Sequence, residues 1–176
     1  MKMLQTIHVK KQKNGEIHHG LLSYNDKTIP CCLGRSGLTD DKKEGDGATP
    51  IGSFRLLYGF HRKDRLVTPQ SNLTFSTIQP DDGWCDAPED KNYNALVKLP
   101  FEASHEIMTR EDRLYDICIV MDYNIEPAIS GLGSAIFFHQ TSPELKPTEG
   151  CVAIDPAHMQ ELLPLLSDQT VMIVHA

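Results

Sequence analysis

Two apolar segments separated by a short polar loop constrain this chain more than any other feature. The first ends in Phe137-Phe138-His139, and the second begins at Cys151 and continues as Val-Ala-Ile. Short apolar runs bounded by turn residues are typical of buried strands. We therefore expect two neighbouring strands whose ends bring an imidazole and a thiol close together.

A thiol beside an imidazole is the arrangement that nucleophilic cysteine catalysis needs, because a base must generate the attacking thiolate. The alternatives are structural. Most cysteines are small buried hydrophobes, and a histidine that ends a strand can be a satisfied core residue. We interpret Cys31, Cys32 and Cys118 as buried structural residues, and both interpretations stay open for Cys151 and His139.

The residues around this pair favour the catalytic interpretation. Strand alternation puts His139 on the same face as Ala135 and Phe137. Gly150, directly before Cys151, lets the backbone turn tightly and leaves room for a substrate carbonyl. Backbone N–H groups at such a turn can also stabilise an oxyanion.

Size and charge limit the classes of protein. The chain has 176 residues, enough for a sizeable core, and we expect one domain over residues 1–176. The formal net charge of −7 argues against nucleic acid or an anionic membrane surface as the main partner, since both attract clustered Lys and Arg. No apolar run is long enough for a transmembrane helix, so no membrane insertion is predicted.

The N-terminal segment and the five cysteines bear on the compartment. Residues 1–10 carry charge but no apolar stretch long enough for a signal peptide. An odd number of cysteines without an export signal favours free thiols in a reducing compartment. We expect a cytoplasmic protein, or a periplasmic one if the natural chain carries a leader.

The pattern along the chain is mainly β. Two turns are predicted between the first strands, a two-residue hairpin at Asn14-Gly15 and another turn at Asn25-Asp26. Residues 61–95, which contain several Pro and Gly, are predicted to form long loops. The strand-like segments are 4–9, 16–24, 28–33, 53–60, 115–121, 135–139 and 170–175.

One helix is predicted near the C-terminus. Asp155 is a good N-cap residue, and Pro156 fits the first helical turn. Apolar residues then recur at helical spacing from Met159 to Leu166, although Pro164 should end or kink the helix. The expected fold class is mainly β with one or few helices.

A glycine-rich segment, residues 43–52, either forms a solvated loop or contributes to a site. It lacks the Gly-Lys-Ser/Thr ending of a phosphate-binding loop and the alternating acidic ligands of a calcium loop. Nearby, Arg35 follows Gly34 and is a candidate to bind a substrate carboxylate. The alternative for Arg35 is an ordinary surface arginine.

No metal site is predicted. Cys85 together with His139 and Cys151 offers the ligand types that zinc prefers, but nothing in the sequence has the paired spacing of a zinc site. We therefore expect neither a metal nor another cofactor.

Together these residues resemble the L,D-transpeptidase (YkuD-type) catalytic domain family, whose hallmark is a histidine followed by a Ser/Thr-x-Gly-Cys turn. Here the hallmark is His139 with Thr148-Glu149-Gly150-Cys151. Other segments resemble one compact bacterial branch of that family, so that the resemblance covers nearly the whole chain. These segments are Leu33–Gly37, Lys43–Phe54, Trp84 with Asp86, Tyr93-Asn94 and Gly133–His139.

The resemblance implies a mixed β-sandwich or barrel-like fold and peptidoglycan stem peptides, or muropeptides, as substrates. It implies attack on the carbonyl of the L-centre of a diamino acid that is followed by a D-amino acid. Carried over to this chain, Cys151 is the nucleophile and His139 takes its proton and returns it to the leaving nitrogen. The N–H groups of Gly150 and Cys151 form the oxyanion hole, and Thr148 holds the turn. Further candidates for substrate contacts are Arg35, Trp84, Asp86, Tyr93 and Asn94.

This chain departs from the common family pattern at three points. The family has His where this chain has Glu149, a longer gap between His and Cys, and an Arg where this chain has Ala153. Donor groups near the substrate must therefore be arranged differently. We expect Arg35 to take over carboxylate recognition, and an Arg35→Ala variant with unchanged substrate KM would rule this out. The role of Glu149 stays open.

The acyl-enzyme can be resolved by water or by an amine. The missing signal peptide favours an L,D-carboxypeptidase that trims recycled muropeptides in the cytoplasm, with a cross-linking or exchanging L,D-transpeptidase as the alternative. A sortase-like enzyme is disfavoured, because it needs an arginine after the cysteine and the chain has no Lys or Arg beyond Lys146. A catalytically inactive muropeptide-binding module is the non-enzymatic alternative.

Overall fold

The computed structural model describes residues 3–176, which form mostly strands and loops. The helices in this range are α1 (Pro156–Leu162) and, directly after it, the 3₁₀ helix η1 (Leu163–Leu165). The strands are β1 (Thr6–Lys11), β2 (His19–Tyr24), β3 (Lys27–Cys32), β4 (Leu38–Thr39), β5 (Thr49–Pro50), β6 (Gly52–His61), β7 (Phe75–Thr77), β8 (Asp82–Cys85), β9 (Leu96–Lys98), β10 (His105–Ile107), β11 (Ile117–Met121), β12 (Phe137–Gln140), β13 (Val152–Ile154) and β14 (Val171–Val174). The predicted fold class, mainly β with few helices, is confirmed.

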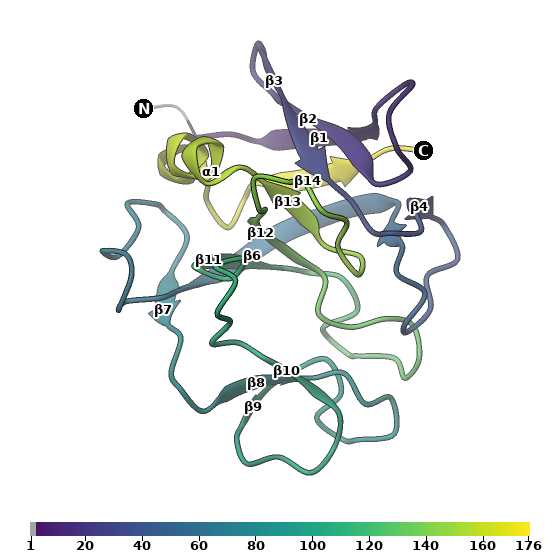
Figure 1. Ribbon diagram of the computed structural model, residues 1–176, viewed down its shortest axis with the longest axis vertical. Coiled ribbons are helices and arrows are strands. Elements are labelled where there is room, and N and C mark those ends of the chain that lie inside the picture. Colours follow the sequence, from purple (N-terminus) through teal and green to yellow (C-terminus); the bar gives the residue numbers. More distant parts are fainter. Residues whose placement is uncertain (1–2) are drawn as a thin grey trace.

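The largest sheet closes on itself. Its nine strands have the order β11-β12-β13-β3-β2-β1-β14-β6-β7, and β11 also pairs with β6. This second pairing makes a barrel-like ring and leaves β7 outside it, at the edge of β6 (Figure 1). Strand β6 pairs with β14 along its first half and with β11 along its second half, which connects the two ends of the ring.

Alternate side chains of the strands fill the inside of the ring. Ile7 and Val9 of β1 and Leu22 of β2 are fully buried, whereas Thr6 and Lys10 point to solvent. This period of two is what a strand with one buried face requires. The ring therefore surrounds the main hydrophobic core of the molecule.

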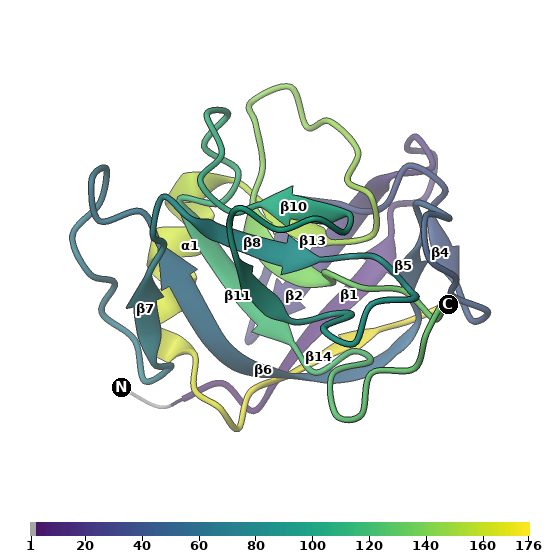
Figure 2. The same ribbon diagram turned by 90° about the horizontal axis from the view of Figure 1, so that it is seen from below.

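A second layer lies beneath the ring in Figure 1 and in front of it in Figure 2. It is the three-stranded sheet β10-β8-β9. Trp84 of β8 packs edge-to-face on Phe137 of β12, with ring centroids 5.0 Å apart. Phe137 belongs to this second cluster while Phe138 belongs to the core inside the ring, which confirms the alternation predicted for the strand.

The helix has the predicted signals at both ends. The Asp155 carboxylate accepts a hydrogen bond from the Ala157 N–H at 2.8 Å, and Pro156 occupies the first turn. Pro164 lies in η1, so the α-helix ends before it, as predicted. Neither helix of residues 3–176 is long and apolar enough to cross a membrane.

Two predictions about turns and loops are wrong. A two-residue hairpin is expected at Asn14-Gly15, but β1 and β2 are joined by a longer connection over residues 12–18. The last residue pair between the two strands is Lys11–Gly20. Residues 61–95 are not all loop, since they contain β7 and β8. These short strands form through pairing with β6, β9 and β10, partners that local sequence does not reveal.

The segments predicted to begin strands at residues 4, 16, 115 and 135 become strands two or three residues later, and local hydrogen bonds explain the last two. The segment 135–139 becomes a strand only at Phe137, because Ala135 has a left-handed φ of 51° and its N–H is bonded to a side chain outside the sheet. The segment 115–121 becomes a strand at Ile117, after a turn in which the Asp116 N–H donates to the Arg113 carbonyl.

The closed ring predicts a large cost for a cavity in its interior. Leu22→Ala should lower the free energy of unfolding by about 2–5 kcal/mol, because the side chain is fully enclosed and the lost volume cannot be refilled by water. Urea unfolding measures this. Val67→Ala is the control, since Val67 is 90% exposed and its truncation should change stability by less than about 0.5 kcal/mol. Equal effects of the two substitutions would contradict the enclosed core.

Candidate active site

Parallel pairing of β12 with β13 places His139 near Cys151. The register pairs Phe138 with Val152 and His139 with Ala153, so Cys151 is the residue directly before β13. Because side chains alternate along a strand, residues 151 and 153 point to the same side. His139, Cys151 and Ala153 all line one cavity.

A tight turn before β13 fixes the position of the cysteine. Gly150 has a φ of 139°, and a Cβ atom there would lie 2.8 Å from the Ala48 carbonyl oxygen, so the position requires glycine. The Thr148 hydroxyl donates to the Cys151 carbonyl at 2.7 Å and accepts from the Gly150 N–H at 3.2 Å. Thr148 therefore closes the turn that presents the thiol.

The Cys151 thiol is buried and contacts two backbone groups. The Phe137 N–H donates to Sγ at 3.3 Å, and the thiol donates to the Ala135 carbonyl at 3.2 Å. Burial raises the pKa of the Cys151 thiol to about 12, and the Glu106 carboxylate acts in the same direction. The resting thiol is therefore protonated at neutral pH and needs a base before it can attack.

The His139 ring can act as such a base. Its Nδ1 lies 2.7 Å from the Gln140 carbonyl oxygen, which can only accept, so Nδ1 carries the proton and Nε2 has a free lone pair. Burial lowers the pKa of His139 to about 4, which keeps the ring neutral at pH 7. Among the hydrogen bonds of residues 3–176, none joins the ring to the thiol. The resting pair is a neutral thiol and a neutral imidazole.

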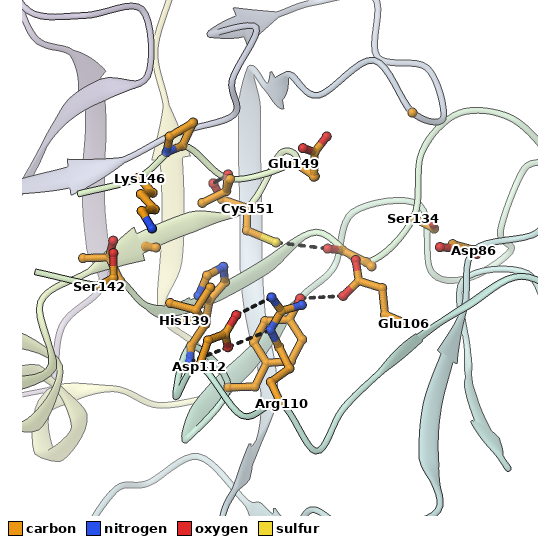
Figure 3. Close-up of a pocket in the computed structure, with 18 of the residues that line it drawn as sticks. Asp86, Glu106, Arg110, Asp112, Ser134, His139, Ser142, Lys146, Glu149 and Cys151 are labelled. Carbon is orange, nitrogen blue, oxygen red and sulfur yellow. Dashed lines mark hydrogen bonds and ion pairs between the residues drawn. The ribbon is translucent and has the colours of Figure 1, made fainter. Parts of the chain in front are cut away.

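The cavity over these two side chains has a volume of about 500 Å³. This is the size expected of a site for a small ligand. Figure 3 shows the Cys151 thiol near its middle, with Lys146 on the same side as His139 and Asp86 on the opposite side. Most of the residues that line it are polar or charged, so it suits a ligand with charges of its own.

One wall of the cavity consists of residues that the sequence analysis missed: Glu106, Arg110, Asp112 and Tyr115. The Tyr115 hydroxyl donates to Glu106 at 2.6 Å. The Arg110 guanidinium donates twice to Asp112, at 3.0 and 2.6 Å, and lies 5.1 Å from the centre of the Tyr115 ring. The positive charge of Arg110 favours the thiolate form of Cys151 and so opposes the effect of burial on the pKa of that thiol.

A weak sequence signal for this wall exists. Charged residues of the segment 110–113 directly precede the predicted strand that becomes β11. Because β11 pairs with β12, the residues before β11 lie beside the end of β12, where the Gln140 N–H donates to the Leu114 carbonyl at 3.2 Å. Only knowledge of the β11–β12 pairing would have placed residues 110–113 next to His139.

Of the five residues predicted to bind substrate, only Asp86 lines the cavity among the described residues. Asn94 lies behind its wall. The Asn94 Oδ1 accepts from the Trp84 indole N–H and from the Ala135 N–H, both at 2.9 Å, and its amide donates to the Asn124 carbonyl at 2.7 Å. Asn94 thus holds Ala135 in place, and the Ala135 carbonyl accepts a hydrogen bond from the Cys151 thiol.

Tyr93 also lies behind the wall. Its hydroxyl donates to Glu44 and accepts from the Gly133 N–H at 3.0 Å. Glu44 also accepts a hydrogen bond from the Ser134 hydroxyl at 2.7 Å. Glu44 and Ser134 both line the cavity. Tyr93 therefore supports the acidic side of the cavity.

Arg35 is engaged by Glu149. Its Nε donates to the Glu149 carboxylate at 2.9 Å, and Nη2 donates to the Gly45 carbonyl at 3.1 Å. Glu149 lines the cavity and Arg35 does not. Both side chains are well exposed to solvent, so the pair contributes little to stability but does orient the Glu149 carboxylate.

One group of side chains in the described part of the chain could hold a metal ion. It consists of Glu16, His18 and His19, whose donor atoms lie within 4.8 Å of one another in the β1–β2 connection and at the start of β2. None of the three lines the cavity. Cys85 is a buried free thiol in β8 and does not line the cavity either.

A closed ring of strands that presents a thiol and an imidazole to one cavity defines a class of cysteine-dependent enzymes. The model of the YkuD family, the L,D-transpeptidase catalytic domain, matches residues 8–174, and the chain belongs to this family. A comparison with curated proteins gives no match. The family performs cysteine-dependent catalysis on peptidoglycan stem peptides, which is the chemistry expected of this fold.

The neutral state of the pair predicts a pH profile for Cys151. Alkylation by iodoacetamide should be slow at pH 7 and rise about tenfold for each pH unit up to about pH 10, because only the thiolate reacts and its pKa lies near 12. Peptide mass spectrometry measures the rate, with the other four cysteines in the same digest as controls. A plateau below about pH 8 would show a thiolate–imidazolium pair instead.

The position of Asn94 predicts a structural role that can be separated from catalysis. Asn94→Ala should lower the free energy of unfolding by about 2–4 kcal/mol, because the buried Trp84 and Ala135 N–H groups lose their acceptor. Urea unfolding followed by fluorescence measures this, since Trp84 is the single tryptophan of the chain. Asn92→Ala, in the neighbouring loop, should cost less than about 1 kcal/mol.

Proposed function

We propose that the protein is an L,D-carboxypeptidase that removes the terminal D-alanine of peptidoglycan stem peptides through a cysteine acyl-enzyme. The observation that carries the proposal is the position of the Cys151 thiol and the His139 ring in one cavity, presented by parallel strands β12 and β13. Membership of the family supplies the substrate class.

In the first half of the reaction, His139 Nε2 takes the proton of the Cys151 thiol as Sγ attacks the carbonyl carbon of the L,D bond. Because both groups are neutral at rest, proton transfer accompanies the attack. The carbon–nitrogen bond then breaks, and the imidazolium returns the proton to the leaving nitrogen of D-alanine. The product is a thioester on Sγ.

In the second half, water attacks the thioester. His139 Nε2 takes a proton from the water, a carboxylic acid forms on the shortened peptide, and Sγ leaves and recovers its proton from the imidazolium. The same base therefore serves both halves of the reaction.

In this proposal, backbone N–H groups of the turn before β13 donate hydrogen bonds to the oxyanion of each tetrahedral intermediate. The N–H groups of Gly150 and Cys151 are the predicted oxyanion donors. In the resting protein the Gly150 N–H donates to Thr148 at 3.2 Å, a long bond that the oxyanion would replace. Arg110, on the opposite wall of the same cavity, adds a positive charge that favours the thiolate and the oxyanion.

The size of the cavity favours hydrolysis over cross-linking. A volume of about 500 Å³ suits the end of one stem peptide together with water. A cross-linking reaction must also admit a second stem peptide to the thioester. In our proposal the substrates are muropeptides recycled into the cytoplasm, where trimming of the tetrapeptide is the useful reaction.

A second candidate is L,D-transpeptidation. The observation that favours it is the description of the matching family, the L,D-transpeptidase catalytic domain. The two reactions share the acyl-enzyme and differ only in whether water or an amine attacks the thioester. The identity of the product therefore distinguishes them.

The test is mass spectrometry of the products after incubation with a disaccharide tetrapeptide. The wild-type protein should release one D-alanine, and Cys151→Ala should be at least about 1,000-fold slower because the nucleophile is lost. His139→Gln should be about 100- to 10,000-fold slower, since the thiol loses its base. Cys85→Ala is the matched control, because this buried thiol does not line the cavity, and it should keep its activity.

A dimeric peptide, or exchange of D-alanine for an added D-amino acid, would make the protein a transpeptidase. Unchanged tetrapeptide with all stem peptides would contradict both activities and leave a muropeptide-binding module. Equal activity of wild type and Cys151→Ala would contradict the role of the thiol.

A further inference from the structure

The charged side chains of the cavity are separated by the Cys151 thiol. In Figure 3, Lys146 and Ser142 lie on the side where His139 lies, whereas Asp86 and Ser134 lie on the other side of the thiol. Glu44 is bonded to Ser134 and so belongs to this second side. The cavity therefore has a basic end and an acidic end.

Several other charges in the lining are already paired within the protein. Arg110 is paired with Asp112 at 2.6 Å, and Lys42 is paired with Asp46 at the same distance. Glu149 is paired with Arg35. None of the ion pairs in residues 3–176 includes Lys146 or Asp86. These two opposite charges at the two ends are thus available for a ligand.

Asp86 is the clearest sign of an ionic ligand. Its Oδ1 atom is buried and has no hydrogen-bond partner within the described residues. A carboxylate oxygen removed from water without a donor is unfavourable, and such an atom in a binding cavity indicates that a ligand supplies the donor. Glu44 lines the same end, so the ligand group that fits there is a cation such as an ammonium.

The position of His139 determines how the substrate is oriented along the cavity. In the proposed reaction His139 protonates the leaving nitrogen, so the departing residue must lie on the His139 side of the thiol. Lys146 lies on this side. The acyl half of the substrate must then extend from the thiol toward Asp86. Charge and chemistry therefore assign one end of the cavity to each half of the substrate.

We propose that Lys146 and Asp86 determine the substrate specificity of this cavity. Lys146 binds the free carboxylate of the departing D-residue, and Asp86 binds the side-chain ammonium of the diamino acid on the acyl side. The substrate is then a stem peptide with an unblocked C-terminus and an unmodified side-chain amine. This assignment rests on the proposed function for its direction, but the presence of two opposite charge sites does not.

Binding to the Cys151→Ala protein tests the two charge sites without turnover. Four versions of the stem tetrapeptide are the probes, with the diamino acid amine free or acetylated and the terminal carboxylate free or amidated. Calorimetry should show that each modification weakens binding by about 10- to 100-fold, as expected for a lost charge-assisted hydrogen bond.

Variants then assign each effect to a residue. In the Cys151→Ala background, Asp86→Asn should bind the free and the acetylated peptide equally while still discriminating against the amide. Lys146→Gln should bind the acid and the amide equally while still discriminating against acetylation. Glu89→Gln and Lys63→Gln are controls, because both residues are exposed and outside the cavity, and they should keep both preferences.

The outcomes separate this inference from the proposed function. If the wild type releases D-alanine but Asp86→Asn or Lys146→Gln keeps full discrimination, the charge assignment is wrong and the carboxypeptidase stands. If the binding pattern is as expected but no peptide is cleaved, the charge sites stand and the proposed function fails.

Discussion

The parallel pairing of β12 with β13 is the constraint on which the rest of the site depends. Parallel neighbours cannot be joined by a tight hairpin, so the chain must leave the end of β12 and return to its start. Here the return is a loop over residues 141–151 instead of a helix. That loop carries Lys146 to one end of the cavity and ends in the Gly150 turn that presents Cys151. The geometry that pairs the strands thus also assembles the site.

Burial sets the chemical state of this site. Both the thiol and the imidazole are enclosed between the ring and the small sheet, and burial disfavours the charged form of each, raising the pKa of Cys151 and lowering the pKa of His139. In such a neutral pair the cysteine is a thiol, not a reactive thiolate, when no substrate is bound. The backbone contacts of Sγ and the Nδ1 contact of His139 fix both groups instead, so that the proton can move when a substrate carbonyl is in place.

Where this chain departs from the common family pattern, other residues at the same cavity provide the nearby charges. Ala153 occupies the position where the family has an arginine, and it lines the same cavity as Arg110, which comes from the segment before β11. Positive charge near the thiol is thus supplied by other parts of the chain, through Lys42 and Arg110. Glu149, where the family has a histidine, is held by Arg35 at the cavity lining. A site can keep its electrostatic character although the residues that provide it change, because charge acts through space and not along the sequence.

The sequence by itself determined the local features of this protein. Alternation marked the strands, Asp155 and Pro164 marked the ends of the helix, and the Gly150 turn marked where a cysteine would be presented, since these signals arise between near neighbours in the chain. Only the tertiary structure decided the closure of the ring, the short strands within residues 61–95, and the wall of Glu106 and Arg110 opposite the thiol. It also separated Asp86, which lines the cavity, from other predicted contacts that lie behind its wall. Those features depend on pairings between distant segments, whose energies come from packing and burial that no local pattern records.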